Sequence, residues 1–236
     1  MRATSIAGSI LLVAACTSSD AVYTPAGASS WNDGYPAAVT AFPPGAPAGT
    51  VELASFGLVE LIPAEVSPMI ALHARIAVTN NASERPWNVD IAGATLRVNG
   101  SEARTLLANS DLPTLPIALI GRGEARTIDL YFAPPAGIRD EEDLAELDVH
   151  VPIAASDRRS AVSAHFTRRE PSELTGARKP AVRLAGSGSH WWADPSHAWP
   201  SFHRSSGAIA PKAPEHAVVI RLPRWQRAPL PRSAQR

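Results

Sequence analysis

The chain has 236 residues, enough for one or two domains, and its hydrophobic content of 45% is that of an ordinary soluble protein. Its single cysteine excludes an intramolecular disulfide and a cluster of metal-bound thiolates. The net charge of zero hides an asymmetry, since residues 17–170 hold 11 Lys/Arg and 19 Asp/Glu whereas residues 171–236 hold 10 and 3. An acidic body with a basic tail favours self-docking or a tail directed at an anionic surface.

The first 16 residues have the pattern of a targeting segment. Arg2 precedes an uncharged apolar run over residues 6–15, which is too short to span a bilayer but suits a secretory signal segment. The run ends at residues 12–16 in Leu-Val-Ala-Ala-Cys, which resembles the lipobox of bacterial lipoproteins. The resemblance implies removal of a signal peptide over residues 1–15 and lipidation of Cys16. It also implies a place in the bacterial cell envelope, at the outer membrane because Thr17 rather than Asp follows the cysteine. The alternative is an ordinary signal peptide that is cut near Ala15.

Residues 16–49 are expected to form a flexible tether behind the lipidated cysteine. Residues 17–49 contain five Pro and four Gly among Ser, Thr and Ala, with no sustained periodicity. Trp31 and Tyr35 are exceptions, because aromatic side chains in a tether can pack back on the body. The tether would let the body reach away from the membrane.

Residues 50–169 are expected to form the folded body, organised around a strand near residues 68–81. Apolar residues alternate there with small or polar ones, which predicts a strand with one face in a core and one in water; the apolar set is Ile70, Leu72, Ala74, Ile76 and Val78. Similar short runs recur along the body, and Asn99-Gly100 is a favoured hairpin turn. About eight short strands without a long amphipathic helix predict an all-β fold.

The strand arrangement favours an antiparallel immunoglobulin-like β-sandwich. Trp87 is then expected to fill the core without a disulfide beside it. The run of strand, Asn-rich turn, Trp-bearing strand and hairpin is similar to telokin-like and other immunoglobulin-like domains of bacterial lipoproteins. This resemblance has no diagnostic motif and implies only the architecture.

Residues 170–236 are expected to form a basic, largely irregular C-terminal tail that docks in part on the sandwich. Nine Pro and four of the six Trp lie in residues 171–236. Strands are conceivable there only at residues 181–184 and 217–222.

The most unusual segment is residues 190–203, which allows three interpretations. A divalent metal site would use His190, His197 and His203, although their spacing matches no compact zinc pattern. A partner, sugar or lipid contact would use the three aromatic residues Trp191, Trp192 and Trp199. The third interpretation is an aromatic flap over the sandwich, or a disordered segment.

Two further groups of polar residues are interpreted as solvated. The acidic run at residues 140–143 is expected to be a charged loop between strands, because no glycine interrupts it as a calcium loop would require. His73, His150 and His165 fall on the expected outer faces of strands and are predicted to be surface residues.

The sequence points to a non-catalytic protein without a cofactor or a nucleic-acid partner. It contains no Gly-x-Ser-x-Gly turn, no His-Glu-x-x-His sequence and no phosphate-binding glycine loop. Three functional hypotheses follow: a membrane-anchored binding or scaffold module with an envelope partner, a structural protein whose Trp-rich tail contacts lipid or a surface polymer, and a metal-handling lipoprotein. The sequence does not identify a small-molecule ligand.

Overall fold

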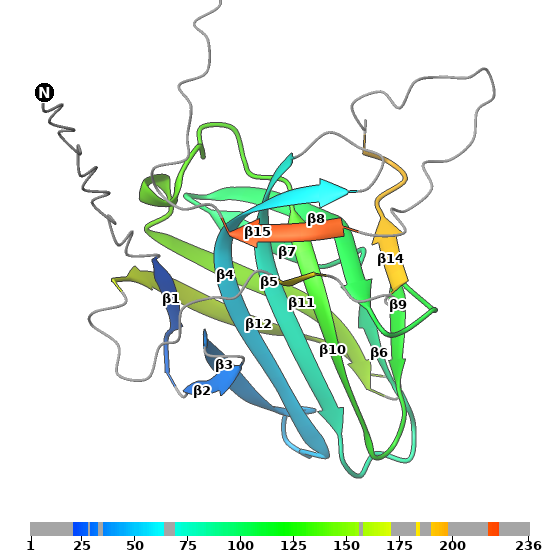
Figure 1. The fold of residues 1–236 in the computed structure, drawn as a ribbon. Coiled ribbons are helices and arrows are strands. Elements are labelled where there is room, and N and C mark those ends of the chain that lie inside the picture. Colours follow the sequence, from blue (N-terminus) through cyan, green and yellow to red (C-terminus); the bar gives the residue numbers. More distant parts are fainter. Residues whose placement is uncertain are drawn as a thin grey trace, which may run out of the picture.

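The computed structural model describes residues 21–27, 29–32, 35–63, 69–155, 158–170, 183–184, 190–197 and 217–221. These residues form 15 strands, all paired in antiparallel fashion, and one short 3-10 helix, η1 (Glu141–Asp143) (Figure 1). Helices of the length and hydrophobicity that a membrane crossing requires do not occur in this part of the chain. The prediction of an all-β fold is confirmed.

The strands form two layers. In one layer β11 (Glu146–Ala155) pairs with β12 (Arg158–Arg169) on one side and with β6 and β7 on the other. At the ends of this layer, β1 pairs with β12 and β9 pairs with β6. The shorter strands of this layer are β1 (Val22–Pro25), β6 (Trp87–Asp90), β7 (Thr95–Val98) and β9 (Ile117–Ile120).

The other layer is built on a long hairpin of β4 (Gly49–Pro63) and β5 (Met69–Asn80). Beyond β5 lie β10 (Glu124–Phe132), β8 (Ser101–Ser110) and β14 (His190–Ala193). On its other edge β4 pairs with β3 (Tyr35–Phe42), which pairs with β2 (Ser29–Asn32), and with β15 (Ala217–Arg221), which pairs with β13 (Arg183–Leu184). Strand β8 pairs with β7 through residues 101–104 and with β10 through residues 105–110, so it joins the two layers.

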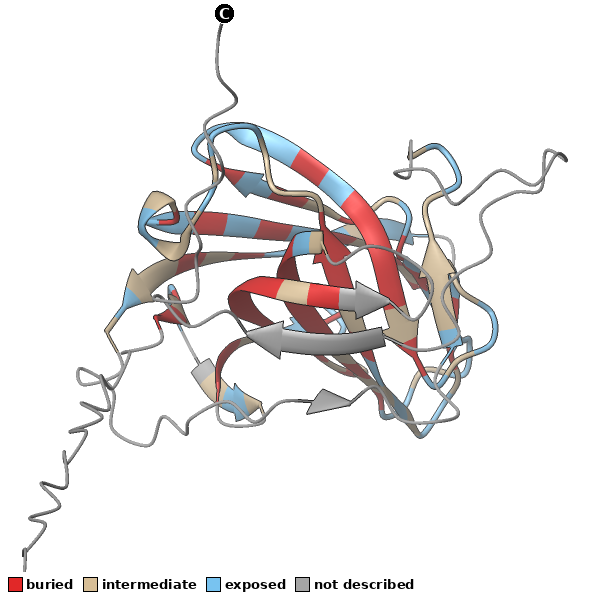
Figure 2. Ribbon diagram, turned by 45° about the horizontal axis from the view of Figure 1, so that its top comes forward, coloured by how far each residue is buried: buried red, intermediate tan, exposed pale blue. Residues whose placement is uncertain are grey.

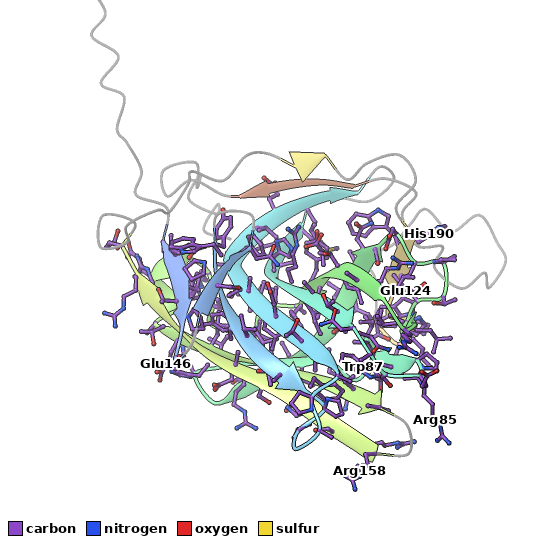
Figure 3. The ribbon with its side chains drawn as sticks, turned by 90° about the horizontal axis from the view of Figure 1, so that it is seen from below. Arg85, Trp87, Glu124, Glu146, Arg158 and His190 are labelled. Atoms are coloured by element: carbon purple, nitrogen blue, oxygen red, sulfur yellow. The ribbon has the colours of Figure 1, made fainter. Side chains whose placement is uncertain are left out.

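A main core lies between the layers. Inward residues at every second position of β5 and β11 are buried, and they belong to one cluster with residues from β4, β10 and β12. Trp87 is fully buried in this cluster, with its ring edge-on to Phe42 at a centroid distance of 5.0 Å. Charged residues such as Arg85 and Arg158 point away from the body (Figure 3). The alternating pattern therefore identified the buried face of these strands correctly, whereas the immunoglobulin-like designation stays a prediction.

The second layer is also buried on its outer face, which the sequence did not predict. Residues 71–76 of β5 are buried without alternation (Figure 2). Two smaller apolar clusters lie on this outer face; one contains Val59, Leu61, Ala71, Leu106, Leu107 and Tyr131, and the other contains Tyr35, Ala37, Ala54 and Phe56. The expectation that β5 has one face in water is wrong, because its outward residues 71, 73 and 75 are buried as well.

The predicted tether is too long. Strands β1, β2 and β3 lie within residues 22–42, and Tyr23 and Phe42 are fully buried in the main core. Tyr35 packs on the body as anticipated, while Trp31 is half-exposed. Pro and Gly content misled the prediction, because backbone pairing with β4 and β12 holds these strands despite their weak periodicity.

The C-terminal segment contributes strands to the sheet. Strands β13 and β15 lie within the two ranges where strands seemed conceivable, and β14 was not anticipated. The longest of the described strands is β4, with 15 residues.

Candidate functional site

The candidate site lies on the outer face of the second layer, beside a bulge in β4. The register between β4 and β5 shifts between Ser55 and Gly57, so that Phe56 is an extra residue with no partner opposite. Gly57 adopts a φ of +71°, a conformation that side chains other than glycine rarely tolerate. The Phe56 ring lies on the outer face together with Ala54, two residues earlier on β4, and it stacks on His73 at a centroid distance of 4.4 Å.

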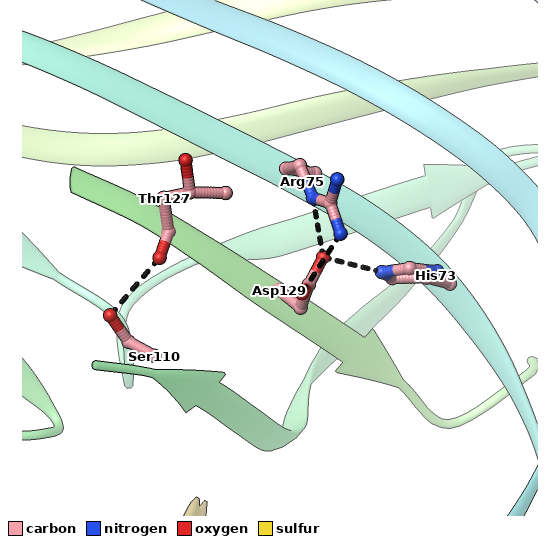
Figure 4. Close-up of polar contacts among 5 residues, drawn as sticks. All are labelled: His73, Arg75, Ser110, Thr127 and Asp129. Atoms are coloured by element: carbon pink, nitrogen blue, oxygen red, sulfur yellow. Dashed lines mark hydrogen bonds and ion pairs between the residues drawn. The ribbon is translucent and has the colours of Figure 1, made fainter. Parts of the chain in front are cut away.

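Beside this ring, β5 and β10 bring three ionisable side chains together (Figure 4). Asp129 lies opposite Arg75 in the antiparallel register. Arg75 donates through Nε to Oδ1 at 2.7 Å and through Nη2 to Oδ2 at 3.1 Å, which is a bidentate contact. His73 Nε2 lies 2.9 Å from the same Oδ1 atom. We call His73, Arg75 and Asp129 the ion cluster.

The ion cluster is buried to a degree unusual for charged groups. Arg75 is 2% exposed and His73 is 7% exposed, so the prediction that His73 is a surface residue is wrong. Burial by itself opposes ionisation of Asp129, but the hydrogen bond and charge of His73, together with the charge and hydrogen bonds of Arg75, hold the pKa of that carboxyl well below its usual range. Asp129 is therefore ionised in the folded protein at neutral pH.

Aromatic rings extend the site in a row across the sheet. Tyr35 contacts Phe56 at 4.3 Å, His73 stacks on Tyr131 at 4.7 Å, and Tyr131 stacks on Trp191 at 5.7 Å, all between ring centroids. The Arg75 guanidinium lies 5.2 Å from the centroid of the Phe56 ring, within range of a cation–π contact. The row therefore combines flat apolar rings with one buried cation and one anion.

The other histidines behave as predicted. His150 is exposed, and its Nδ1 lies 2.9 Å from the Ser163 hydroxyl. His165 is partly exposed and lies 2.8 Å from Asp148. Both lie on the outward face of the first layer, so His73 differs because only the second layer is covered on its outer face.

The acidic run at residues 140–143 forms specific contacts within the fold and is not simply a solvated loop. Residues 141–143 form η1, and Asp140 and Asp143 close a reciprocal capping box at its start. The Glu141 carboxylate accepts a hydrogen bond from the Tyr23 hydroxyl at 2.7 Å and another from the Leu58 backbone N–H at 2.9 Å. Glu141 therefore binds both β1 and β4, at the position on β4 between its pairings with β3 and β15, which corrects the expectation for Glu141.

The predicted tryptophan contact residues are used within the chain. Trp191 and Trp192 are half-buried on β14. Trp191 packs on the outer-face cluster that contains Val59 and Tyr131, and Trp192 packs on the main core. They therefore hold β14 from both faces of the sheet. Trp199 lies outside the described residues, as does the predicted lipidation site Cys16.

The predicted metal ligands are placed only in part. His190 is exposed on β14, and its backbone carbonyl accepts a hydrogen bond from Asn109 Nδ2. His197 follows the strand in a turn with Asp194, and His203 lies outside the described residues. Within the described ranges, the structure contains no group of three His, Cys, Asp or Glu side chains suited to a metal.

His197 also lines an open cavity of about 380 Å³ beside the first half of β8. Its walls come from residues 102–106, residues 133–135 after β10, and the turn after β14. The Asp194 carboxylate is engaged there by the backbone and hydroxyl of Ser196 at 2.9 and 2.8 Å. The charged groups at the cavity are of mixed sign and give no preference for one class of ligand.

Sequence reasoning missed the ion cluster for a definable reason. Arg75 and Asp129 occupy positions of their strands that alternation assigns to water. Only the pairing register places the two residues opposite one another and brings Phe56 of β4 beside His73 of β5. A weak signal was present, since His73 and Arg75 are the only polar ionisable residues in an otherwise small or apolar stretch of β5.

Comparisons with known protein families, with curated proteins and with solved structures found no match.

Proposed function

We propose that this protein is a lipid-anchored lipoprotein of the bacterial cell envelope that acts as a non-catalytic binding or scaffold module. The lipobox-like residues 12–16 support the anchor, because they combine an apolar segment, small residues and the only cysteine of the chain. Cys16 would carry the acyl chains, and the outer membrane is the expected destination.

The observation that carries the binding role is strand β9. Among the described residues it has a single strand neighbour, β6, and it presents Ile117 and Leu119 outward with 51% and 46% of their surface exposed. Native sheet edges are normally protected by charge, proline or a covering segment. An apolar edge favours a partner that adds an extended strand with alternating apolar side chains.

Pairings within the chain show why strand addition suits this sheet. Strands β14 and β15 come from the C-terminal segment, yet they attach to β8 and β4, which are far away in sequence. Backbone hydrogen bonds supply most of such a contact, so few side-chain matches are needed. The partner would be an envelope protein or a surface polymer held close to the membrane.

The anchor is tested by growing cells with a labelled palmitate analogue. The wild-type chain should carry the label, fractionate with membranes and begin at a modified Cys16 in mass spectrometry. A Cys16→Ser variant is the matched control and should lose the label and the membrane association. Recovery of unlabelled wild-type protein with an intact Met1 would refute the anchor.

The binding edge is tested by photo-crosslinking in intact cells from a reactive group at position 88, next to β9. The wild-type edge should give a defined crosslinked species, and Leu119→Lys should remove it because a charge at an edge opposes strand addition. Asn88 itself is exposed and lies opposite Leu119 in the register. Thr95→Lys, on β7, is the control for a nonspecific effect of charge. If it removes the crosslinked species as completely as Leu119→Lys does, β9 is excluded as the contact.

A further inference from the structure

Strand β9 pairs through one side of its backbone only. The Ile91 N–H donates to the Pro116 carbonyl at 2.9 Å. This bond fixes the phase of the ladder between β6 and β9, because bonded and non-bonded residue pairs alternate in antiparallel strands. Residues 116, 118 and 120 therefore direct their backbone groups to β6. Residues 117, 119 and 121 direct theirs to the open edge.

Other groups already occupy most of this edge. Gly121 donates its N–H to Glu124 Oε2 at 3.1 Å, and its carbonyl accepts from the Glu124 N–H at 3.1 Å. The Ile117 N–H donates to the Thr114 carbonyl at 3.2 Å. Leu119 is then the one residue of the edge whose N–H and C=O both lack a partner within the described ranges. A long added strand would therefore find few open donors here.

An edge of this kind is complementary to itself. If two copies meet about a two-fold axis at Leu119, each Leu119 N–H donates to the Leu119 carbonyl of the other copy, which is the bonded pair of an antiparallel ladder. The same surface is used on both sides, as a two-fold dimer requires. Ile117 of each copy then lies opposite Gly121 of the other, where the absence of a side chain leaves room for it.

The charges around the edge agree with this pairing. Residues 112–121 are uncharged, so the acidic body does not place like charges at the axis. Asp111 precedes this stretch and Arg122 follows it. An antiparallel arrangement brings the Arg122 end of one copy to the Asp111 end of the other. Charges of opposite sign therefore flank the contact, as in electrostatically complementary interfaces.

We propose that the occupant of the β9 edge is a second copy of this chain, paired antiparallel through β9 about a two-fold axis at Leu119. The inference rests on the binding role proposed above for β9 and not on the lipid anchor. The contact is small, whereas stable complexes bury about 1,200–2,000 Å². Association is therefore weak in solution, and anchoring two copies to one membrane would raise their effective concentration.

Disulfide trapping in the full chain tests the proposal, with Cys16→Ser so that the introduced cysteine is the only one. Leu119→Cys should give a covalent dimer under a mild oxidant, because the Cα atoms of a bonded opposite pair lie about 5.5 Å apart, within disulfide range. Asn88→Cys is the matched control. Asn88 is exposed beside Leu119, but three strand spacings, about 14 Å, would separate the two cysteines.

The dimer should form at least about tenfold faster from Leu119→Cys than from Asn88→Cys, since only the first pair is within bonding distance. Equal rates in the two variants would indicate random collision and overturn the proposal. Failure of Leu119→Cys to dimerise would overturn it as well.

A mixture of two variants keeps the test decisive if Leu119→Cys alters the far-ultraviolet circular dichroism. Ile117→Cys and Gly121→Cys should each stay monomeric alone, because four residues along the strand, about 13 Å, separate like positions. Mixed together, the two chains should form a heterodimer, since positions 117 and 121 lie opposite one another. Equal linking in the mixture and in the separate variants would contradict the axis at Leu119.

The photo-crosslink from position 88 separates this inference from the binding role itself. With two differently tagged forms of the chain in the same cells, a second copy gives a species that carries both tags. A species that contains a different protein and is lost in Leu119→Lys would overturn the second copy as the occupant and keep β9 as a binding edge. The absence of any crosslinked species would overturn both proposals.

Discussion

At the scale of single residues, the ion cluster decides how the outer face of the second layer behaves. Asp129 balances the buried charge of Arg75 through two hydrogen bonds and also binds His73. Removing charges from water is costly, and the cost is offset only while every member keeps its partner. The cluster therefore fixes the register of β5 against β10 more than it adds net stability.

Replacing Asp129 with Asn should destabilise the protein strongly. The amide cannot neutralise Arg75, and an uncompensated buried charge typically costs about 3–5 kcal/mol in the free energy of unfolding. Urea denaturation measures this loss. Asp148→Asn is the control, because Asp148 is half-exposed and contacts His165 at the surface, where such a pair contributes less than about 1 kcal/mol. Equal losses in the two variants would contradict the importance of the cluster.

Acid should weaken the protein through the same carboxyl group. The pKa of Asp129 in the folded state lies below its ordinary value of about 3.8, so its ionised form stabilises the fold above that pH. As the pH falls below about 5, the unfolded chain takes up the proton first and this stabilisation is progressively lost. The difference in unfolding free energy between wild type and Asp129→Asn should therefore shrink toward acid pH. A constant difference between pH 7 and pH 3 would contradict the lowered pKa.

At the scale of elements, the bulge in β4 joins the two layers. The edge of β4 is covered by β3 up to Ala54 and by β15 from Val59 onward. Between them, Glu141 from η1 binds the Leu58 amide and the Tyr23 hydroxyl. One carboxylate thus links β1, β4 and the loop before β11, which is why this acidic run is held in place.

Gly57→Ala should disturb this junction. An added Cβ would lie 2.5 Å from the Tyr23 ring and 2.6 Å from Glu141 Oε1, in addition to the strain of a positive φ. We expect a loss of more than about 2 kcal/mol, since such backbone strain alone costs about 1–3 kcal/mol. Gly100→Ala is the control, because Gly100 has a φ of +79° but nothing within 4 Å of the added atom. Thermal unfolding of both variants separates the clash from the strain, and similar losses would contradict the clash.

Strand β14 depends on its two tryptophans because it has only four residues and one strand neighbour in the described part of the chain. Trp191→Ala should remove about 1–3 kcal/mol, the range expected for burying a large apolar side chain. Trp31→Ala should change stability by less than about 0.5 kcal/mol, because Trp31 is 50% exposed. Hydrogen exchange at residues 107–110 should also become faster in Trp191→Ala alone. Unchanged exchange there would show that the ring does not hold the strand.

At the scale of the whole molecule, the main core and the outer-face clusters share the same strands. Residues 72, 74 and 76 of β5 point into the main core, while residues 71, 73 and 75 point to the outer face. Neither side can lose its packing without disturbing the strand that also serves the other side. The two sides are therefore expected to unfold together.

We expect a single cooperative transition for the described body. Tryptophan fluorescence, to which Trp87 in the main core and Trp191 on the outer face contribute among six tryptophans, should give the same midpoint as far-ultraviolet circular dichroism. Urea unfolding monitored by both probes measures this. Two separated transitions would indicate that the outer-face clusters form an independent unit.

Prediction from the sequence succeeded where alternation reports burial. Four of the five inward positions of β5 were assigned correctly, because a strand with a period of two must send those side chains to one face; Ile70, near the start of the strand, is exposed instead. It failed for residues 22–42, where strands of low hydrophobic periodicity are held by pairing with β4 and β12. It also failed for His73, since polarity alone places such a residue in water.

The sequence by itself determined an all-β chain with one cysteine, an acidic body and a basic end, because composition and strand periodicity are local properties of the residues. Only the tertiary structure decided that His73, Arg75 and Asp129 meet, that the Phe56 ring stacks on His73, and that Glu141 completes the edge of β4. The contacts of Asp129 and Glu141 join residues about 55 to 85 positions apart, so they depend on strand register, which is not encoded in any single stretch of the chain.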